Sequence, residues 1–212
     1  MLFLLDSANL DDARTCARWG WVKGITTNPN ILAKAGKSAE KTLAKLKKTI
    51  DGPIFYQLTG DSKESMVQEA KTVYEILRKR LVLKIPATPL GFEACAVLSE
   101  KYPCAITSIF SAAQALVASA AGAKYALYYH NRAKRLLDDG NVLSTALVRV
   151  LKGTGTAVIA ASLKSADEII EAREAGVKIM TTTLEVLTQL TSHDLSNQAV
   201  ADFDVNGIGI QI

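Results

Sequence analysis

The 212-residue chain has few of the side chains that build disulfide or metal sites. Its three cysteines (Cys16, Cys95 and Cys104) are odd in number and contain no close pair. This argues against a disulfide framework or a thiolate zinc site and favours a reducing compartment such as the cytoplasm. The two histidines, His130 and His193, are far apart in sequence. They offer no clustered metal-ligand spacing, so we expect no metal site.

Long apolar runs and an excess of one charge are also absent. No run approaches the roughly 20 residues of a membrane span, and residues 1–5 are apolar without the basic start of a signal peptide. The net charge of +4 is too small to indicate a nucleic-acid partner. With 49% hydrophobic and 22% charged residues, the composition is that of an ordinary globular protein. We expect a cytoplasmic protein that contacts neither membrane nor nucleic acid.

What the sequence does contain is an alternation of short β-rich runs and amphipathic segments. Strands are predicted at residues 2–6, 22–26, 54–58, 81–85, 105–108, 125–129, 157–161 and 177–180. Several are almost wholly apolar, as is typical of strands covered on both faces. The segments between them, such as 39–50 and 62–77, have helical periodicity. Ser62 and Ser165 are predicted N-caps, and Glu168 three residues after Ser165 fits a capping box.

Eight β–α units of about 25 residues predict a (β/α)8 TIM barrel, close to the lower size limit of that fold. A doubly wound open sheet is the main alternative, and the number of strands favours the barrel. We expect a single domain over residues 1–212 with a short C-terminal segment at about 193–212. Because barrel active sites are built from the loops that follow the strands, polar residues at the predicted strand ends are the candidates for function.

Lys84 is the most informative of these residues. It lies within an apolar strand, with large aliphatic side chains on either side. Burial disfavours the charged form of a lysine and lowers its pKa, and the neutral amine can condense with a ketone to form a Schiff base. The alternative is an edge-strand lysine whose stem packs while its head reaches solvent. Taken alone, the residue favours that alternative, because buried lysines are rare.

Other strand ends carry further polar side chains. Asp6 could cap the next helix or transfer protons. Gln57 cannot titrate and is limited to holding water or a substrate hydroxyl. Tyr129 is either a partly buried aromatic or a proton donor. Arg132 with Ser162 and Lys164 fits a phosphate site at the late strands, although a surface ion pair and a helix cap are equally compatible.

Five ordered segments then carry a family resemblance. They are residues 4–9 (LLDSAN), 24–29 (GITTNP), 83–86 (LKIP), 111–115 (SAAQA) and 160–164 (AASLK). These segments resemble the signatures of the transaldolase family, and most of all its small-subunit branch, which includes fructose-6-phosphate aldolase. The resemblance extends from residue 3 to about residue 195 with similar spacing, which makes it far more specific than any single motif.

The resemblance implies a Schiff-base enzyme on a TIM barrel that needs neither a metal nor another cofactor. It implies that Lys84 is the Schiff-base lysine, that Asp6 acts in proton transfer, that Thr26, Asn28 and Thr107 bind sugar hydroxyls or position water, and that Arg132 and Ser162 bind the substrate phosphate with Lys164 close by. It also implies a homo-oligomer, since family members form pentamers that pair into decamers.

Two positions separate the branches of the family. Transaldolases have a glutamate on the third strand and a phenylalanine before the phosphate-binding arginine, whereas fructose-6-phosphate aldolases have glutamine and tyrosine. This chain has Gln57 and Tyr129. The resemblance therefore implies reversible cleavage of fructose 6-phosphate to dihydroxyacetone and glyceraldehyde 3-phosphate. The alternatives are a transaldolase of the pentose phosphate pathway, which transfers a dihydroxyacetone unit between sugar phosphates, and a phosphosugar-binding barrel without carbon–carbon chemistry.

Overall fold

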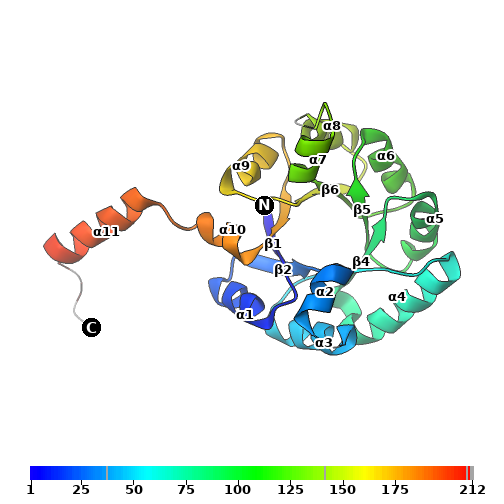
Figure 1. Cartoon of the computed structure of the whole chain (residues 1–212), viewed down its shortest axis with the longest axis horizontal. Helices are drawn as coiled ribbons and strands as arrows, with labels where there is room; N and C mark the ends of the chain where they lie inside the picture. Colours follow the sequence, from blue (N-terminus) through cyan, green and yellow to red (C-terminus); the bar gives the residue numbers. More distant parts are fainter. Residues whose placement is uncertain (37, 141, 209, 211–212) are drawn as a thin grey trace.

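A computed structural model of the chain describes residues 1–36, 38–140, 142–208 and 210. Eight parallel strands pair in sequence order, and the last strand pairs with the first, so the sheet closes into a barrel (Figure 1). The strands are β1 (Leu2–Asp6), β2 (Val22–Thr26), β3 (Ile54–Gln57), β4 (Leu81–Pro86), β5 (Cys104–Ile109), β6 (Tyr125–Tyr129), β7 (Ala157–Ala161) and β8 (Ile179–Thr182). The predicted (β/α)8 barrel is confirmed.

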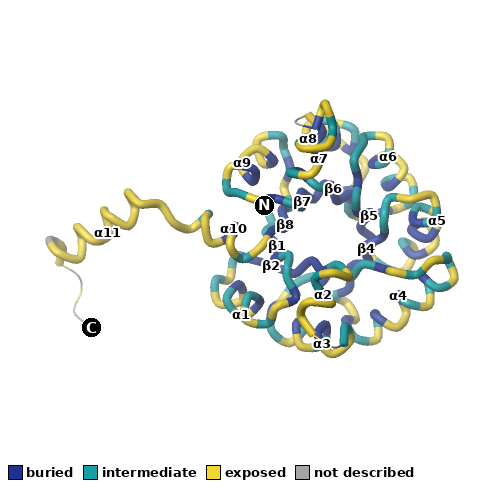
Figure 2. The backbone as a smooth tube through the Cα atoms, viewed as in Figure 1, coloured by how far each residue is buried: buried dark blue, intermediate teal, exposed yellow. Residues whose placement is uncertain are grey.

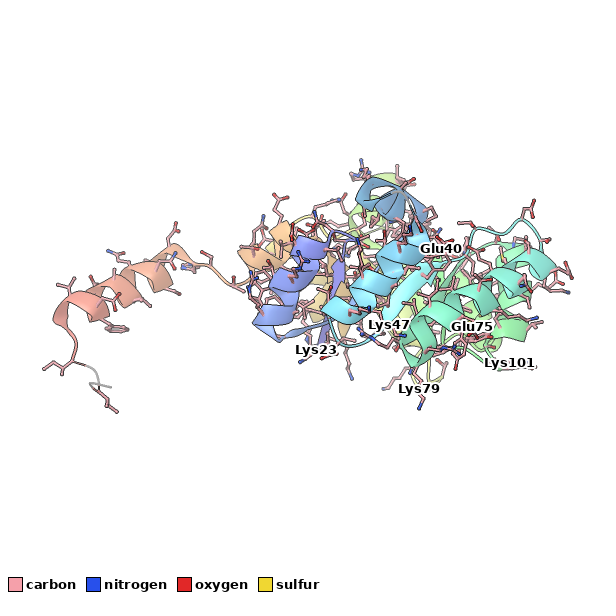
Figure 3. All side chains as sticks on the ribbon, turned by 90° about the horizontal axis from the view of Figure 1, so that it is seen from below. Lys23, Glu40, Lys47, Glu75, Lys79 and Lys101 are labelled. Atoms are coloured by element: carbon pink, nitrogen blue, oxygen red, sulfur yellow. The ribbon has the colours of Figure 1, made fainter. Side chains whose placement is uncertain are left out.

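Helices surround the strands and complete the β–α alternation. They are α1 (Leu10–Trp19), α2 (Pro29–Ala35), α3 (Ala39–Thr49), α4 (Lys63–Leu77), α5 (Pro89–Leu98), α6 (Ala112–Ala120), α7 (His130–Leu136), α8 (Leu143–Val150), α9 (Ala166–Glu174), α10 (Leu184–Gln189) and α11 (Asp194–Asn206), with a 3-10 turn at Arg78–Arg80. The strands and the inner faces of the helices are buried, and the outer helix faces are exposed (Figure 2). Charged side chains such as Glu75 and Lys79 point outward, while Lys47 of α3 donates to the main-chain oxygen of Ile76 at 2.8 Å (Figure 3).

Helix α11 extends away from the barrel (Figure 1). Its described side chains, residues 194–205, are all exposed. The C-terminal segment therefore contains a helix of three and a half turns, roughly, by the usual 3.6 residues per turn. In the described part of the chain, no helix is long and apolar enough to cross a membrane.

Helix caps follow the sequence closely, with two corrections. Ser62 and Ser165 cap α4 and α9 as predicted. Ser165 Oγ accepts from the main-chain nitrogen of Glu168 at 3.2 Å, but the carboxylate of Glu168 accepts from Lys164 N rather than returning to Ser165. Only half of the predicted capping box therefore forms. Helix α1 is capped by Asn9, so capping by Asp6 is wrong.

Four strands, β3, β4, β5 and β8, differ from the prediction at one or both ends. The largest difference is at β8, which begins at Ile179 and continues to Thr182, two residues beyond the predicted end. It pairs with β1 along Leu2–Leu5. Threonine is β-branched and fits a pleated strand, so the threonines after Met180 extend β8 toward the same end of the barrel as the other strands.

Two cores hold the barrel together. The larger one lies between strands and helices, and the smaller one fills the barrel interior with Leu4, Phe55, Val82, Ala105, Leu127, Ile159 and Ala161. Because side chains alternate along a strand, the residue two positions after each of these interior core residues, on the same strand, also faces the barrel interior. Five strands have a polar residue at that position: Asp6, Gln57, Lys84, Thr107 and Tyr129. The interior is thus apolar below and polar at the end where the strands finish, where barrel enzymes carry their active sites.

Candidate active site

A cavity of about 140 Å³ opens at the carboxyl ends of the strands. It is lined by Asp6, Thr26, Asn28, Lys84, Tyr129, Arg132, Ala161, Ser162, Lys164 and Thr181. All of the residues predicted for the site except Gln57 and Thr107 are therefore brought together. A larger hollow of about 560 Å³ is bordered by Lys34, Lys41 and Lys45, and the side chains of these three lysines are exposed, unlike that of Lys84.

Lys84 stands at the floor of this cavity in β4 and is only 3% exposed. Its Nζ donates to the main-chain oxygen of Thr27 at 2.8 Å. Burial lowers the pKa of Lys84, and the negative charges that Asp6 and Tyr129 can carry oppose that shift. A closed barrel has no edge strand, so the alternative of an edge lysine with a solvated head is wrong. An amine in this setting reaches the neutral, nucleophilic form more easily than one in water.

A chain of hydroxyl groups ends at Asp6. Thr26 Oγ1 donates to Asp6 Oδ1 at 2.6 Å, and Thr26 Oγ1 lies 2.6 Å from Thr181 Oγ1. Since a hydroxyl has only one proton to donate, the hydrogen bond between the threonines must be donated by Thr181. Both threonines are buried, so the direction of this chain is fixed and it orients the carboxylate beside Lys84.

Thr181 is the site residue that the sequence analysis missed. The predicted strand stopped at Met180, just before Thr181 and two residues before the observed end of β8. The signal was present in the alternation of Ile179 and Thr181, which both face the barrel interior.

Tyr129 forms one wall of the cavity. Its hydroxyl accepts from Ser108 Oγ at 3.2 Å and lies 3.4 Å from Thr107 Oγ1. Thr107 therefore contacts the site through Tyr129 rather than lining the cavity itself. The guanidinium of Arg132 lies over the Tyr129 ring, 4.6 Å from its centroid, which is a cation–π contact.

The cationic side of the cavity is formed by the start of α7, which directly follows β6, and by the loop after β7. Arg132 comes from the first turn of α7, and Ser162 and Lys164 follow β7. Ser162 has a φ of 58°, in the left-handed region that non-glycine residues rarely adopt. Such conformations persist where the surroundings impose them, often at ligand sites. Asn28 has a second role, because its Oδ1 accepts from Ile31 N at 2.9 Å and caps α2.

Gln57 lies beside this cavity but does not line it. It is the direct partner of Lys84 across the β3–β4 ladder, yet it borders a separate hollow of about 310 Å³ together with Tyr56 and Thr59. Its proposed part in holding water near Lys84 stays a prediction. Among the residues that the structure describes, no group of three or more His, Cys, Asp or Glu side chains is arranged to hold a metal ion.

Known proteins share this sequence pattern over nearly the whole chain. The family described as Transaldolase/Fructose-6-phosphate aldolase matches residues 3–208. The chain belongs to this family. A probable transaldolase of Symbiobacterium thermophilum is 37% identical over 206 residues, covering 96% of this chain and 95% of its own length. A probable transaldolase of Caldicellulosiruptor saccharolyticus is 35% identical over 207 residues with the same coverage of both chains.

Solved structures support the fold of this transaldolase-family chain at much lower identity. Orotidine 5'-monophosphate decarboxylase from Metallosphaera sedula superposes with a TM-score of 0.63 at 14% identity, covering 95% of this chain and 96% of its own. Mandelate oxidase with (S)-2-phenylpropionate superposes with a TM-score of 0.63 at 16% identity, covering 87% of this chain and 64% of its own. At these identities the likeness concerns the barrel alone.

Proposed function

We propose that this member of the family is a Schiff-base transaldolase that transfers a dihydroxyacetone unit from a ketose phosphate to an aldose phosphate. One observation carries the proposal: a buried lysine with a lowered pKa shares one cavity with a carboxylate and a cationic pocket. The names of the relatives support transfer, whereas the sequence alone favoured direct cleavage of fructose 6-phosphate.

The first half of the reaction uses Lys84 and Asp6. The neutral amine of Lys84 adds to the ketone carbon of the donor, and the resulting hydroxyl takes up a proton from solvent and leaves as water, which gives an iminium ion. Asp6 takes the proton of the hydroxyl two carbons from the iminium carbon. The bond between the hydroxyl-bearing carbon and the carbon next to the iminium carbon then breaks, which releases an aldose phosphate. The bonding electrons move to the iminium and leave an enamine on Lys84.

The second half runs these steps backward with another aldehyde. The enamine carbon attacks the carbonyl carbon of the acceptor, and the new alkoxide recovers the proton held by Asp6. Hydrolysis of the iminium then releases the new ketose phosphate and regenerates the amine. Atoms and protons balance over the cycle, and no step calls on an oxidant or reductant.

The phosphate of each substrate would bind on the cationic side of the cavity. Arg132 offers a guanidinium that can pair two phosphate oxygens, Ser162 offers a hydroxyl, and Lys164 adds a second charge. Lys84 lies at the floor of the same cavity, so a sugar phosphate anchored by its phosphate can extend its carbonyl end toward the amine. Thr26 and Asn28 line the cavity and would bind sugar hydroxyls, and Thr107 would act through the hydroxyl of Tyr129.

A second candidate, fructose-6-phosphate aldolase, is supported by the hydroxyl of Tyr129 in the cavity wall. The two activities share every step up to the enamine and differ in its fate. If Tyr129 or a water protonates the enamine carbon, hydrolysis releases dihydroxyacetone and no acceptor is needed.

The test is release of glyceraldehyde 3-phosphate from fructose 6-phosphate with and without erythrose 4-phosphate. We expect release that depends on the acceptor. Equal release in its absence would overturn transfer in favour of the aldolase. Borohydride with dihydroxyacetone should attach a stable adduct at Lys84, located by peptide mass spectrometry, and Lys84→Met should abolish it. An adduct on another lysine, or none, would overturn the Schiff-base assignment and favour a binding protein.

A further inference from the structure

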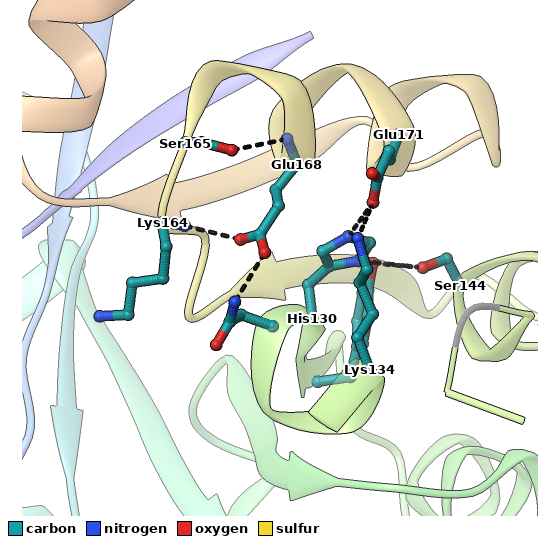
Figure 4. Close-up of polar contacts among 9 residues, drawn as sticks. His130, Lys134, Ser144, Lys164, Ser165, Glu168 and Glu171 are labelled. Carbon is teal, nitrogen blue, oxygen red and sulfur yellow. Dashed lines mark hydrogen bonds and ion pairs between the residues drawn. The ribbon is translucent and has the colours of Figure 1, made fainter. Parts of the chain in front are cut away.

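Glu168 is a buried carboxylate that joins α7 to the loop after β7, the two segments that form the cationic pocket. It lies in the first turn of α9 and is 9% exposed. One oxygen accepts from Asn131 Nδ2 at 2.7 Å. The other accepts from the main-chain nitrogen of Lys164 at 2.7 Å (Figure 4). Asn131 belongs to α7 and Lys164 to the loop after β7. A single side chain therefore holds both segments that supply the cationic residues.

The residues that Glu168 holds are sequence neighbours of the pocket. Asn131 precedes Arg132, and Lys164 itself lines the cavity two residues after Ser162. The main-chain nitrogen of Asn131 also donates to the main-chain oxygen of Ser162 at 3.3 Å. Glu168 and this main-chain bond together fix the distance between the start of α7, which contains Arg132, and the loop that contains Ser162.

Helix α7 has no side-chain cap at its N-terminus, so contacts with neighbouring elements fix its start. It has only seven residues, and Tyr129 at its N-cap position makes no side-chain capping bond. Ser162 is held in the left-handed backbone region, which a non-glycine residue keeps only where its surroundings impose it. Arg132 is exposed and rests on the Tyr129 ring. The geometry of the pocket must therefore come from neighbouring contacts.

A second carboxylate fastens the same two helices one turn further along. Glu171 Oε2 lies 3.0 Å from His130 Nε2 and accepts from Lys134 Nζ at 2.6 Å (Figure 4). His130 is buried, and its Nδ1 lies 3.1 Å from the hydroxyl of Tyr128 and 3.3 Å from Ser144 Oγ. This second contact attaches α7 to α9, but only Glu168 reaches the loop that contains Lys164.

The negative charge of Glu168 also needs an explanation. A carboxylate close to a phosphate site opposes anion binding unless its charge is taken up elsewhere. Glu168 does not line the cavity, and its two oxygens are each occupied by an N–H donor. Its charge is directed at α7 and at the loop after β7 rather than at the ligand, which fits a role in holding these two segments.

We propose that Glu168 is the positioning residue of the phosphate pocket, which acts through Asn131 and Lys164 to set the spacing of Arg132 and Ser162. This inference rests on the proposed sugar-phosphate chemistry. It predicts that the loss of Glu168 affects recognition of the phosphate group and spares the reaction of Lys84 with an unphosphorylated ketone.

The experiment compares Glu168→Ala with Glu168→Gln in the full chain. Alanine removes both hydrogen bonds. Glutamine keeps an oxygen for Lys164 N, and its NH2 group can donate to Asn131 once the Asn131 amide turns over. We expect alanine to raise the KM for fructose 6-phosphate by about 10-fold or more, the effect of losing a charge-assisted hydrogen bond. The glutamine variant should stay near the wild type although its charge is gone.

Two controls separate positioning from general damage. The rate of borohydride trapping with dihydroxyacetone, which has no phosphate, should be unchanged in both variants. Glu174→Ala removes an exposed glutamate from the same helix and should change neither measurement. If Glu168→Ala does not fold, Asn131→Ala decides instead, because it removes one arm of the contact and leaves Glu168 bonded to Lys164 N.

The outcomes distinguish this inference from the proposed function. A wild type that forms no adduct with dihydroxyacetone would overturn the proposed function. A reactive wild type with an unchanged KM in Glu168→Ala would overturn only the positioning role. Equal losses with fructose 6-phosphate and with dihydroxyacetone would also overturn it, because they would indicate general disruption of the barrel.

Discussion

The amine nitrogen of Lys84 lies 2.8 Å from the main-chain oxygen of Thr27, a residue 57 positions earlier in the chain. The contact joins β4 to the end of β2 within the barrel. A carbonyl oxygen accepts a hydrogen bond from a lysine whether the amine is charged or neutral. The contact therefore orients the Lys84 side chain without fixing its protonation state. Burial of the amine lowers the pKa of Lys84.

The first prediction concerns the pH dependence of the Lys84 reaction. Burial lowers the pKa of Lys84, so the neutral amine accumulates below the usual lysine pKa of about 10.4. The rate of borohydride trapping with dihydroxyacetone should rise with pH and level off well before that value. A rate that keeps rising through it would contradict the lowered pKa.

A second prediction follows from the bond between Thr26 and Asp6. Asp6→Asn keeps an oxygen that can accept from Thr26 Oγ1 but removes the group that takes a proton. Loss of a general base typically costs about 10²–10⁴-fold in rate, so kcat with fructose 6-phosphate should fall by that order. Asp11→Asn, an exposed aspartate paired with Arg14, is the matched control and should leave kcat unchanged. Equal effects of the two substitutions would exclude a specific role for Asp6.

Thr181 supplies a third prediction. Thr181→Val keeps the shape of the side chain but removes the hydroxyl that donates to Thr26. Thr26 can still donate to Asp6, but its own oxygen loses a partner in a buried setting, which costs about 1–3 kcal/mol. We expect a lower melting temperature and a reduced kcat. The conservative Thr181→Ser should restore both, and a failure of serine to do so would mean that the methyl group matters more than the hydroxyl.

The barrel and most of its cavity could be predicted because both depend on local patterns. The runs of β-branched residues identify the strands, and the alternation of side chains along each strand predicts that Asp6 and Lys84 face the barrel interior. Thr181 was missed only because the predicted end of β8 fell short. Gln57 shows the limit of strand alternation as a rule. It pairs with Lys84 between β3 and β4, but the hollow that its side chain borders is determined by packing around α2.

The contacts of Glu168 could not be predicted from the sequence. Three residues after a capping serine, a glutamate usually returns to the cap. Here the carboxylate of Glu168 instead accepts hydrogen bonds from the side chain of Asn131, which is 37 positions away, and from the main-chain nitrogen of Lys164. That choice depends on how α9 packs beside α7, and no local pattern encodes it. The same reason hid the contact between His130 and Glu171, which joins residues 41 positions apart.

Tyr129 gives a fourth prediction, which concerns the balance between transfer and cleavage. Tyr129→Phe removes a hydroxyl that contacts Ser108 and Thr107 but keeps the ring beneath Arg132. If that hydroxyl protonates the enamine, release of glyceraldehyde 3-phosphate without an acceptor should fall by about 10²-fold, while release with erythrose 4-phosphate should hold within a few-fold. Tyr125→Phe, at the other end of the same strand, should leave the ratio of the two rates unchanged. Equal loss of both rates would assign the hydroxyl to a shared step.

The final prediction concerns Glu171 and the stability of the barrel. Lys134 and His130 lower the pKa of this carboxyl group, so the folded state favours its ionised form. The stabilisation is therefore complete above the unfolded pKa of about 4.3 and is lost as the pH falls through the lower folded value. Because the Glu171 side chain is 47% exposed, Glu171→Gln should lower the free energy of unfolding at pH 7 by less than about 1 kcal/mol. Urea denaturation should show that this difference shrinks as the pH falls below the unfolded value, while Glu174→Gln should show no difference at any pH. A gap that persists in acid would mean that Glu171 stabilises the fold through geometry rather than charge.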